Sequence, residues 1–170
     1  YGGAFSVAAN GKLNVYDGSV YDNTATVTGN AVYTDGTLNF YSGAFIDSSN
    51  DVYLPSGKQI NMMAKSIYAT SVVTVTPQVY EEGVLILEGN YTAMNSNLCT
   101  VTPQEETVWH VNSGGRLTTD EIKYVLTASF FQSDEVPYTS IEEAMADIGD
   151  NPAIITLIDD IVLKETVIIK

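Results

Sequence analysis

The residues that could support acid–base chemistry are carboxylates with few basic partners. Cleavage of a glycosidic bond requires two carboxyl groups at a set separation, one of them acting as an acid. Asp22 and Asp47 recur at an interval of 25 residues, which would stack them about 4.8 Å apart on neighbouring strands. Both lie in turn-like segments, and neither Arg116 nor His110, the single arginine and histidine, has an aspartate pair beside it. We therefore predict that the chain is not an enzyme and has no catalytic residue.

Metal and thiol chemistry have no clear basis in the sequence. The stretch "DSSND", residues 47–51, offers turn carboxylates and carbonyls of the kind that calcium binds. It lacks the glycine bend and the distal bidentate glutamate of an EF-hand, so a solvated turn explains it better. Cys99 is the only cysteine, which excludes an internal disulfide framework, and its strand-like surroundings favour a small buried hydrophobe over a reactive thiol. We predict no metal and no cofactor.

A sugar-binding surface has a clearer basis in the sequence than a catalytic or metal site. Asn14 and Tyr16 recur 25 residues later as Asn39 and Tyr41, on what should be an outward face. Aromatic rings give apolar contact to a sugar, and amide groups orient its hydroxyls. Tyrosine ladders also stabilise sheet faces without binding anything, so a purely structural role is the alternative. Two further tyrosines are candidates to extend the column: Tyr33 and Tyr53.

The overall charge makes some classes of binding partner unfavourable. The 170 residues include 21 acidic and seven basic side chains, giving a formal net charge of −14. Such a field repels phosphate backbones and anionic lipid, so we expect no nucleic-acid partner and no membrane partner. No apolar run approaches the roughly 18 residues of a membrane-spanning helix. An acidic chain rich in Thr, Asn, Ser and Gly with one cysteine is typical of extracellular bacterial proteins, which favours an extracellular location.

An internal repeat determines how these residues must be arranged. The segment "GKLNVYDGSVYDN", residues 11–23, returns as "GTLNFYSGAFIDSSN", residues 36–50. Self-similarity over such a short period indicates a stacked repeat architecture. At a shift of 25 the alignment pairs Gly11 with Gly36, Leu13 with Leu38, Asn14 with Asn39, Val15 with Phe40, Tyr16 with Tyr41, Gly18 with Gly43, Val20 with Phe45 and Asp22 with Asp47. Ala4 with Ala31 and Asn23 with Asn50 align at 27, so the length differences fall in turns.

Within each copy, apolar and polar residues alternate as in a strand with one buried face. Leu13 and Val15 should point inward, and Asn14 and Tyr16 outward. A unit this short can form one coil of a parallel β-helix, in which equivalent residues of successive coils stack about 4.8 Å apart. We therefore predict an all-β parallel β-helix, or solenoid.

Several segments resemble a known class of surface protein. "GGAF", residues 2–5, with "VYDN", residues 20–23, resembles the GGA[ILV]…FxxN tandem repeats of bacterial cell-surface β-helix adhesins, with Val20 in place of the usual aromatic residue. Residues 50–62, 73–91 and 99–117 are similar to the closing coils of β-helix units in large repetitive surface proteins of Gram-positive gut-type bacteria. The resemblance implies a right-handed, pectin-lyase-like β-helix.

The same resemblance implies a function. It suggests an extracellular structural and adhesive module at the cell surface, presenting a carbohydrate-binding or matrix-binding face to glycans. The alternative is a noncatalytic segment of a carbohydrate-active β-helix enzyme, either a polysaccharide lyase or a glycoside hydrolase. We also expect the coils to contact neighbouring repeats of the same chain or another copy of it.

The C-terminal third departs from the repeat. Residues 122–130 fit either a helix or a strand, and the β-rich composition favours the strand. Residues 140–149 predict one short α-helix, because Ser140 and Glu143 form a capping box and Gly149 supplies a stop. We assign residues 1–118 to the closing coils of one β-helix unit. Residues 119–170 would then hold a seam, a capping helix and the first strands of a following β-helix-like unit.

Overall fold

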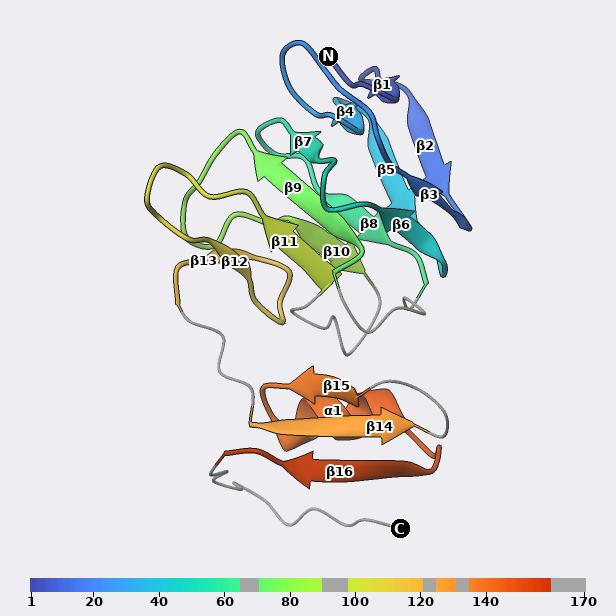
Figure 1. Cartoon of the computed structure of the whole chain (residues 1–170), viewed down its shortest axis with the longest axis vertical. Helices are drawn as coiled ribbons and strands as arrows, with labels where there is room; N and C mark the ends of the chain where they lie inside the picture. The colour runs from blue at the N-terminus through green and yellow to red at the C-terminus, as the bar shows by residue number, and fades with distance from the viewer. Residues whose placement is uncertain (65–70, 90–97, 121–124, 131–134, 160–170) are drawn as a thin grey trace. The chain divides into compact units, whose positions relative to one another are not determined.

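The structure, a computed structural model, describes residues 1–64, 71–89, 98–120, 125–130 and 135–159. It divides into two compact units, Tyr1–Glu121 and Ile122–Lys170. Figure 1 shows the strands of the first unit in blue to yellow and the elements of the second in orange to red.

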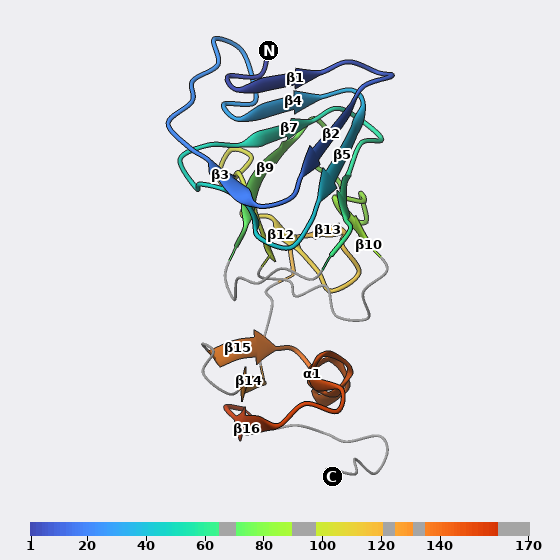
Figure 2. The same cartoon turned by 90° about the vertical axis from the view of Figure 1, so that its right-hand side faces the viewer.

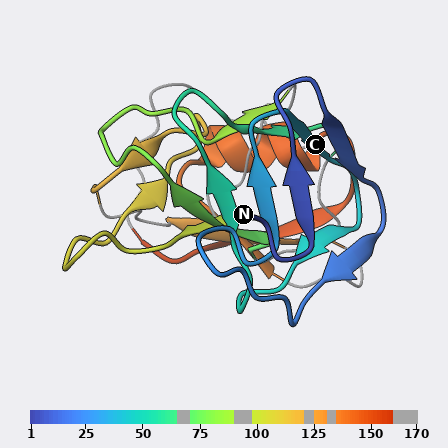
Figure 3. The same ribbon diagram turned by 90° about the horizontal axis from the view of Figure 1, so that it is seen from above.

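The first unit is a parallel β-solenoid. One sheet runs in the order β1 (Phe5–Val7), β4 (Val32–Thr34), β7 (Val52–Leu54), β9 (Val73–Pro77) and β11 (Cys99–Val101). A second contains β2 (Lys12–Val15), β5 (Thr37–Phe40), β8 (Ile60–Met62) and β10 (Leu87–Gly89), and a third pairs β3 (Gly18–Val20) with β6 (Ala44–Ile46). All these neighbours pair in parallel, as Figures 2 and 3 show for successive coils, which confirms the predicted fold class.

The register of β2 and β5 is the one that the repeat predicts. Leu13 lies opposite Leu38, and Leu38 lies opposite Ile60 on the next strand. The shift of 27 also holds on the neighbouring side, where the backbone N–H of Ala4 donates to the carbonyl of Ala31 at 3.0 Å. The stacking of equivalent residues, on which the fold prediction depends, is confirmed.

On the third side the predicted register was wrong by one residue. Val20 pairs with Ile46 rather than Phe45, and Gly18 pairs with Ala44 rather than Gly43. The cause is a longer turn before β6, which includes Gly43 at a φ of 81°, a left-handed conformation that favours glycine. Asp22 and Asp47 are consequently out of register with each other.

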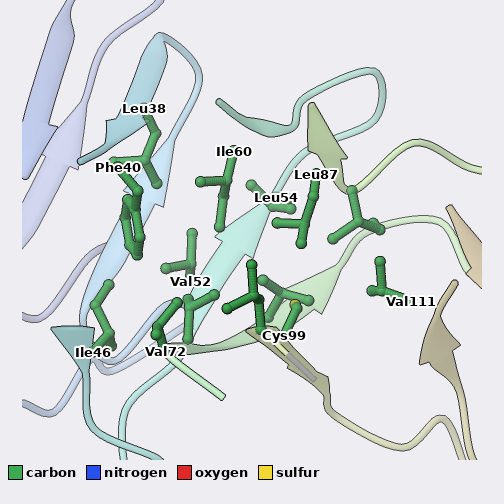
Figure 4. Close-up of a cluster of buried hydrophobic side chains, with 14 of the residues drawn as sticks. Leu38, Phe40, Ile46, Val52, Leu54, Ile60, Val72, Leu87, Cys99 and Val111 are labelled. Atoms are coloured by element: carbon green, nitrogen blue, oxygen red, sulfur yellow. The ribbon is translucent and has the colours of Figure 1, made fainter. Parts of the chain in front are cut away.

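The inward residues form one continuous core between the sheets (Figure 4). Leu38, Phe40 and Ile60 are each 0 % exposed. Burying each such side chain contributes roughly 1.5–3 kcal/mol. Their first-coil equivalents Leu13 and Val15 are only partly buried, because β2 is the end strand of its sheet.

A hairpin follows the last parallel strand. β12 (His110–Val111) and β13 (Leu117–Thr118) pair antiparallel, on either side of the turn that contains Gly114 and Gly115. The side-chain Oδ1 of Asn112 accepts hydrogen bonds from the backbone N–H groups of Gly114 and Arg116. Leu117 is completely buried, so the hairpin contributes to the same core.

The second unit is a small antiparallel sheet with one helix. Its strands β14 (Leu126–Phe130), β15 (Glu135–Tyr138) and β16 (Ala153–Leu157) pair in the order β15-β14-β16. β14 confirms the strand interpretation for residues 126–130, and residues 122–124 of the same prediction lie outside the described residues. Parallel pairing does not occur among the described strands of this unit. That residues 119–170 begin a second β-helix stays a prediction, because 160–170 lie outside the described residues.

The helix α1 (Ile141–Ile148) confirms the predicted short helix near the C-terminus. Ser140 accepts a hydrogen bond from the N–H of Glu143 at 3.1 Å, as an N-cap does. The Glu143 carboxylate, however, accepts from the N–H and hydroxyl of Thr139 instead of from the Ser140 N–H. The apolar stripe of α1 packs on β14 and β15, with Ala144 and Ile148 buried.

Tyr138 makes the stability of this second unit sensitive to alkaline pH. Its side chain is 1 % exposed and its hydroxyl donates to Oδ2 of Asp147 at 2.5 Å. Burial first, and then that hydrogen bond and the Asp147 charge, raise the pKa of Tyr138 well above its usual range. An unfolded tyrosine ionises near pH 10, whereas Tyr138 in the folded state keeps its proton to higher pH. The stabilisation of the folded state by the buried, protonated phenol is therefore fully present below about pH 10 and is lost as the pH rises above it.

We therefore expect the unfolding free energy of the full chain to fall more steeply above pH 10 than that of a Tyr138→Phe variant. The difference in slope should reach about 1.4 kcal/mol per pH unit. Urea unfolding at pH 8 and pH 11, followed by circular dichroism, measures it. If the unfolding free energies of the two proteins fell equally with pH, the pKa of Tyr138 would not be raised in the folded state.

Candidate functional site

The predicted asparagines form a ladder along the solenoid. The side-chain Nδ2 of Asn39 donates to Oδ1 of Asn14 at 2.8 Å, and Nδ2 of Asn61 donates to Oδ1 of Asn39 at 2.9 Å. The three residues occupy matching positions on β2, β5 and β8, so the parallel register brings their amides together. The hydrogen bonds run from coil to coil and hold that register.

This ladder changes what the asparagines can offer a ligand. Asn39 alternates with the inward Leu38 and Phe40, yet it is only 6 % exposed. Its amide bonds to the rungs on both sides, which satisfies a group that would otherwise be costly to bury. Asn14 is the exposed rung at the end strand. Among the two predicted asparagines, Asn14 is therefore the one accessible to a sugar hydroxyl.

The predicted tyrosines follow directly after these strands and stack on each other. The ring centroids of Tyr16 and Tyr41 lie 4.2 Å apart, with 19° between the ring planes. The N–H of Tyr41 donates to the carbonyl of Val15 at 2.8 Å, so the parallel pairing continues to this point. Tyr16 is 58 % exposed. A hydrogen bond with Tyr16 first, and partial burial second, raise the pKa of Tyr41.

Tyr33 and Tyr53 do not extend this column. They lie on β4 and β7, in a different sheet, where their rings stack at 5.7 Å. Tyr1 packs on Tyr33 at 4.8 Å and forms a second aromatic row with them. Partial burial, followed by the charge and hydrogen bond of Asp35, raises the pKa of Tyr33. The prediction of one continuous tyrosine column was wrong, because alternation along a strand does not specify which sheet the strand joins.

The carboxylates of the "DSSND" turn accept hydrogen bonds from nearby backbone and side-chain groups. Asp47 accepts hydrogen bonds from the backbone N–H and the hydroxyl of Ser49, at 2.9 and 2.6 Å, and these bonds lower its pKa. Asp51 accepts from the N–H of Asn30 and from the hydroxyl of Thr76, both at 2.7 Å. Within the part of the chain that the structure describes, no group of three or more His, Cys, Asp or Glu residues could hold a metal ion.

The remaining predicted residues are also placed in the first unit. Arg116 donates from Nη1 to the carbonyl of Gly83 at 2.7 Å, which ties the hairpin to the preceding turn. His110 pairs with Thr118 across that hairpin. Cys99 is buried in the core, as predicted, and burial raises its pKa.

Sequence reasoning missed a hydroxyl ladder on the first sheet. The Oγ1 of Thr102 donates to Oγ1 of Thr76 at 3.0 Å, and Thr76 in turn donates to Asp51. The hydroxyl of Tyr80 lies 2.7 Å from Oγ1 of Thr102, and its ring contacts Trp109 at 5.9 Å. The signal was present: "TVTPQ" occurs at 74–78 and again at 100–104, the same shift of 26 that pairs β9 with β11.

Replacing Asn39 by alanine tests how much the asparagine ladder contributes. The change removes hydrogen bonds to Asn14 and Asn61, each worth about 0.5–1.5 kcal/mol net. We expect a loss of about 1–3 kcal/mol in urea unfolding. The matched control is Asn14→Ala, which removes one bond at the exposed end and should cost less than about 1.5 kcal/mol. An equal loss of unfolding free energy in the two variants would show that Asn39 contributes no more to stability than Asn14 does.

A scan against protein-family models found no match, and neither a search of curated proteins nor a search of solved structures found one. Among the described residues, the structure contains no helix long and apolar enough to cross a membrane.

Proposed function

We propose that this chain is a structural and adhesive module of a bacterial cell-surface protein, acting outside the cell. The observation that carries the proposal is the use of polar side chains to tie one coil to the next. The Asn14–Asn39–Asn61 ladder and the Thr76–Thr102 ladder run along the stack rather than converging on a reaction centre. Such construction suits a stiff element that projects or presents a surface.

The surface that it would present is the strip formed by Asn14, Tyr16 and Tyr41. The exposed ring of Tyr16 can give apolar contact to a sugar ring, and the Asn14 amide can donate to a hydroxyl group. The net charge of −14 favours neutral glycans or matrix components over anionic polymers, because like charges repel. The proposal also takes the solenoid to be right-handed and pectin-lyase-like, as the sequence resemblance implies.

Binding to immobilised neutral glycans tests the strip. The double variant Tyr16→Ala, Tyr41→Ala should lose most of the wild-type binding. Tyr21→Ala is the control, because Tyr21 is also largely exposed, at 62 %. Retained binding in the double variant, or equal loss in Tyr21→Ala, would overturn the assignment of the strip. Release of reducing sugar by the wild type would instead support the alternative origin in a carbohydrate-active enzyme.

A further inference from the structure

We propose that Tyr16 and Tyr41 form an oxidative cross-linking site, at which a peroxidase-type one-electron oxidant joins the two rings as dityrosine. The inference does not depend on glycan binding. It rests on the stacked geometry, with the ring centroids 4.2 Å apart and the planes 19° from parallel. The product would be a covalent bridge between the first and second coils of the solenoid.

The backbone holds the two rings in place before any reaction. Val15 and Phe40, which precede them, are paired in the parallel register of β2 and β5. The two phenol rings are stacked, so ring carbons of Tyr16 lie against ring carbons of Tyr41. Dityrosine forms by bonding between ortho carbons. Tyr16 is 58 % exposed, which leaves its ring accessible to an oxidant in solution.

The reaction balances with peroxide as the oxidant. Each phenol loses one electron and its hydroxyl proton, and the two resulting phenoxyl radicals form one carbon–carbon bond between their ortho positions. The two ring hydrogens then move to the oxygens, which restores both aromatic rings and both hydroxyls. The pair has lost two electrons and two protons in total, and hydrogen peroxide takes them up to give two molecules of water.

Among the described residues of the first unit, the other tyrosine contacts are less suited to this coupling. The rings of Tyr33 and Tyr53 are nearly parallel, at 8°, but their centroids lie 5.7 Å apart. Tyr1 and Tyr33 are closer, at 4.8 Å, but their planes are tilted by 42°. The hydroxyl of Tyr33 is also directed to the carboxylate of Asp35 at 3.4 Å. Tyr16 and Tyr41 should therefore couple first.

The bridge would reinforce the first coil of the solenoid, where the core is only partly covered. Leu13 and Val15 of the first coil are only partly buried. A link between residues 16 and 41 closes a loop and reduces the freedom of the unfolded chain. We expect the midpoint of thermal unfolding of the oxidised protein to rise by about 5–15 °C.

The test treats the full chain, at high dilution, with a haem peroxidase and hydrogen peroxide. Peptide mass spectrometry should find Tyr16 joined to Tyr41 within one chain, at the summed peptide mass less two hydrogens. Tyr41→Phe keeps a stackable ring but removes the phenol, and it should lower the yield of intramolecular dityrosine about tenfold, because proximity drives the coupling. Tyr53→Phe is the matched control and should leave the yield nearly unchanged.

Three results would overturn the proposal. They are cross-links that form chiefly between chains, an intramolecular product that involves Tyr33 instead, and an undiminished yield in Tyr41→Phe. Circular dichroism of each variant before oxidation establishes that the solenoid is folded in all the proteins compared.

Discussion

Replacing Leu38 by aspartate is expected to unfold the solenoid. Leu38 is 0 % exposed and lies between Leu13 and Ile60 on the neighbouring strands. An unpaired carboxylate at this position would lose its water and gain no partner, at a cost of several kcal/mol, in addition to the roughly 2 kcal/mol lost with the leucine. The sum of about 5 kcal/mol or more is comparable with the whole stability of a typical domain.

Urea unfolding followed by the fluorescence of Trp109, the single tryptophan, measures this effect in the first unit. Leu13→Asp is the matched control, since Leu13 has the same place in the repeat but is only partly buried on the end strand. Its carboxylate can reach water, so a loss of about 1–2 kcal/mol is expected. Tyr41→Ala should stay folded. Similar stability of Leu38→Asp and wild type would show that the inward and outward faces are misassigned.

Gly36→Ala should cost about 3 kcal/mol or more, because it forces two coils apart. A Cβ atom at Gly36 would lie 2.3 Å from the carbonyl oxygen of Gly11, 2.4 Å from that of Ala8 and 2.8 Å from Cγ1 of Val7. Two of these atoms belong to the backbone of the coil above and cannot turn away. The glycine is needed here for the close approach of one turn to another.

The equivalent glycine of the first copy provides the comparison. A Cβ atom at Gly11 would lie 3.0 Å from the carbonyl oxygen of Ala8 and 3.1 Å from Cγ1 of Val7, so small shifts relieve the contact. Gly11→Ala should therefore cost about 1 kcal/mol. Thermal and urea unfolding of both variants test the contrast. A Gly36→Ala protein as stable as the wild type, or a larger loss in Gly11→Ala, would mean that these turns do not stack as closely as described.

The repeat was sufficient to predict the stacking of the first two coils. The alternation around Leu13 and Leu38 and their interval of 25 residues specify both the buried face and the parallel neighbour. The register failed at β6 because one additional turn residue before it does not change the alternation within the strand. In the second unit, the pairing of Leu126–Phe130 with Ala153–Leu157 joins distant segments that carry no repeated phrase. Local patterns predict those strands but not their partner.

The candidate site was predictable in its residues but not in its chemistry. Alternation placed Asn39 outward, and it could not show that the amides of Asn14 and Asn61 would close over it. The exposure of Asn39 depends on the neighbouring coils, which bring the amides of Asn14 and Asn61 within hydrogen-bonding distance of it. The assignment of Tyr33 and Tyr53 failed for a related reason, since the sheet that a strand joins depends on the turns before it.

Nuclear Overhauser contacts between the two copies of the repeat provide the most direct test of the stacking. If equivalent residues lie one above the other on parallel strands, the methyl groups of Leu13 should contact those of Leu38, and Leu38 should contact Ile60. Strong Hα–Hα contacts between facing residues of Lys12–Val15 and Thr37–Phe40 are the mark of antiparallel pairing, in which facing Cα atoms approach to about 4.5 Å. Finding those contacts, or no contact between Leu13 and Leu38, would contradict the solenoid.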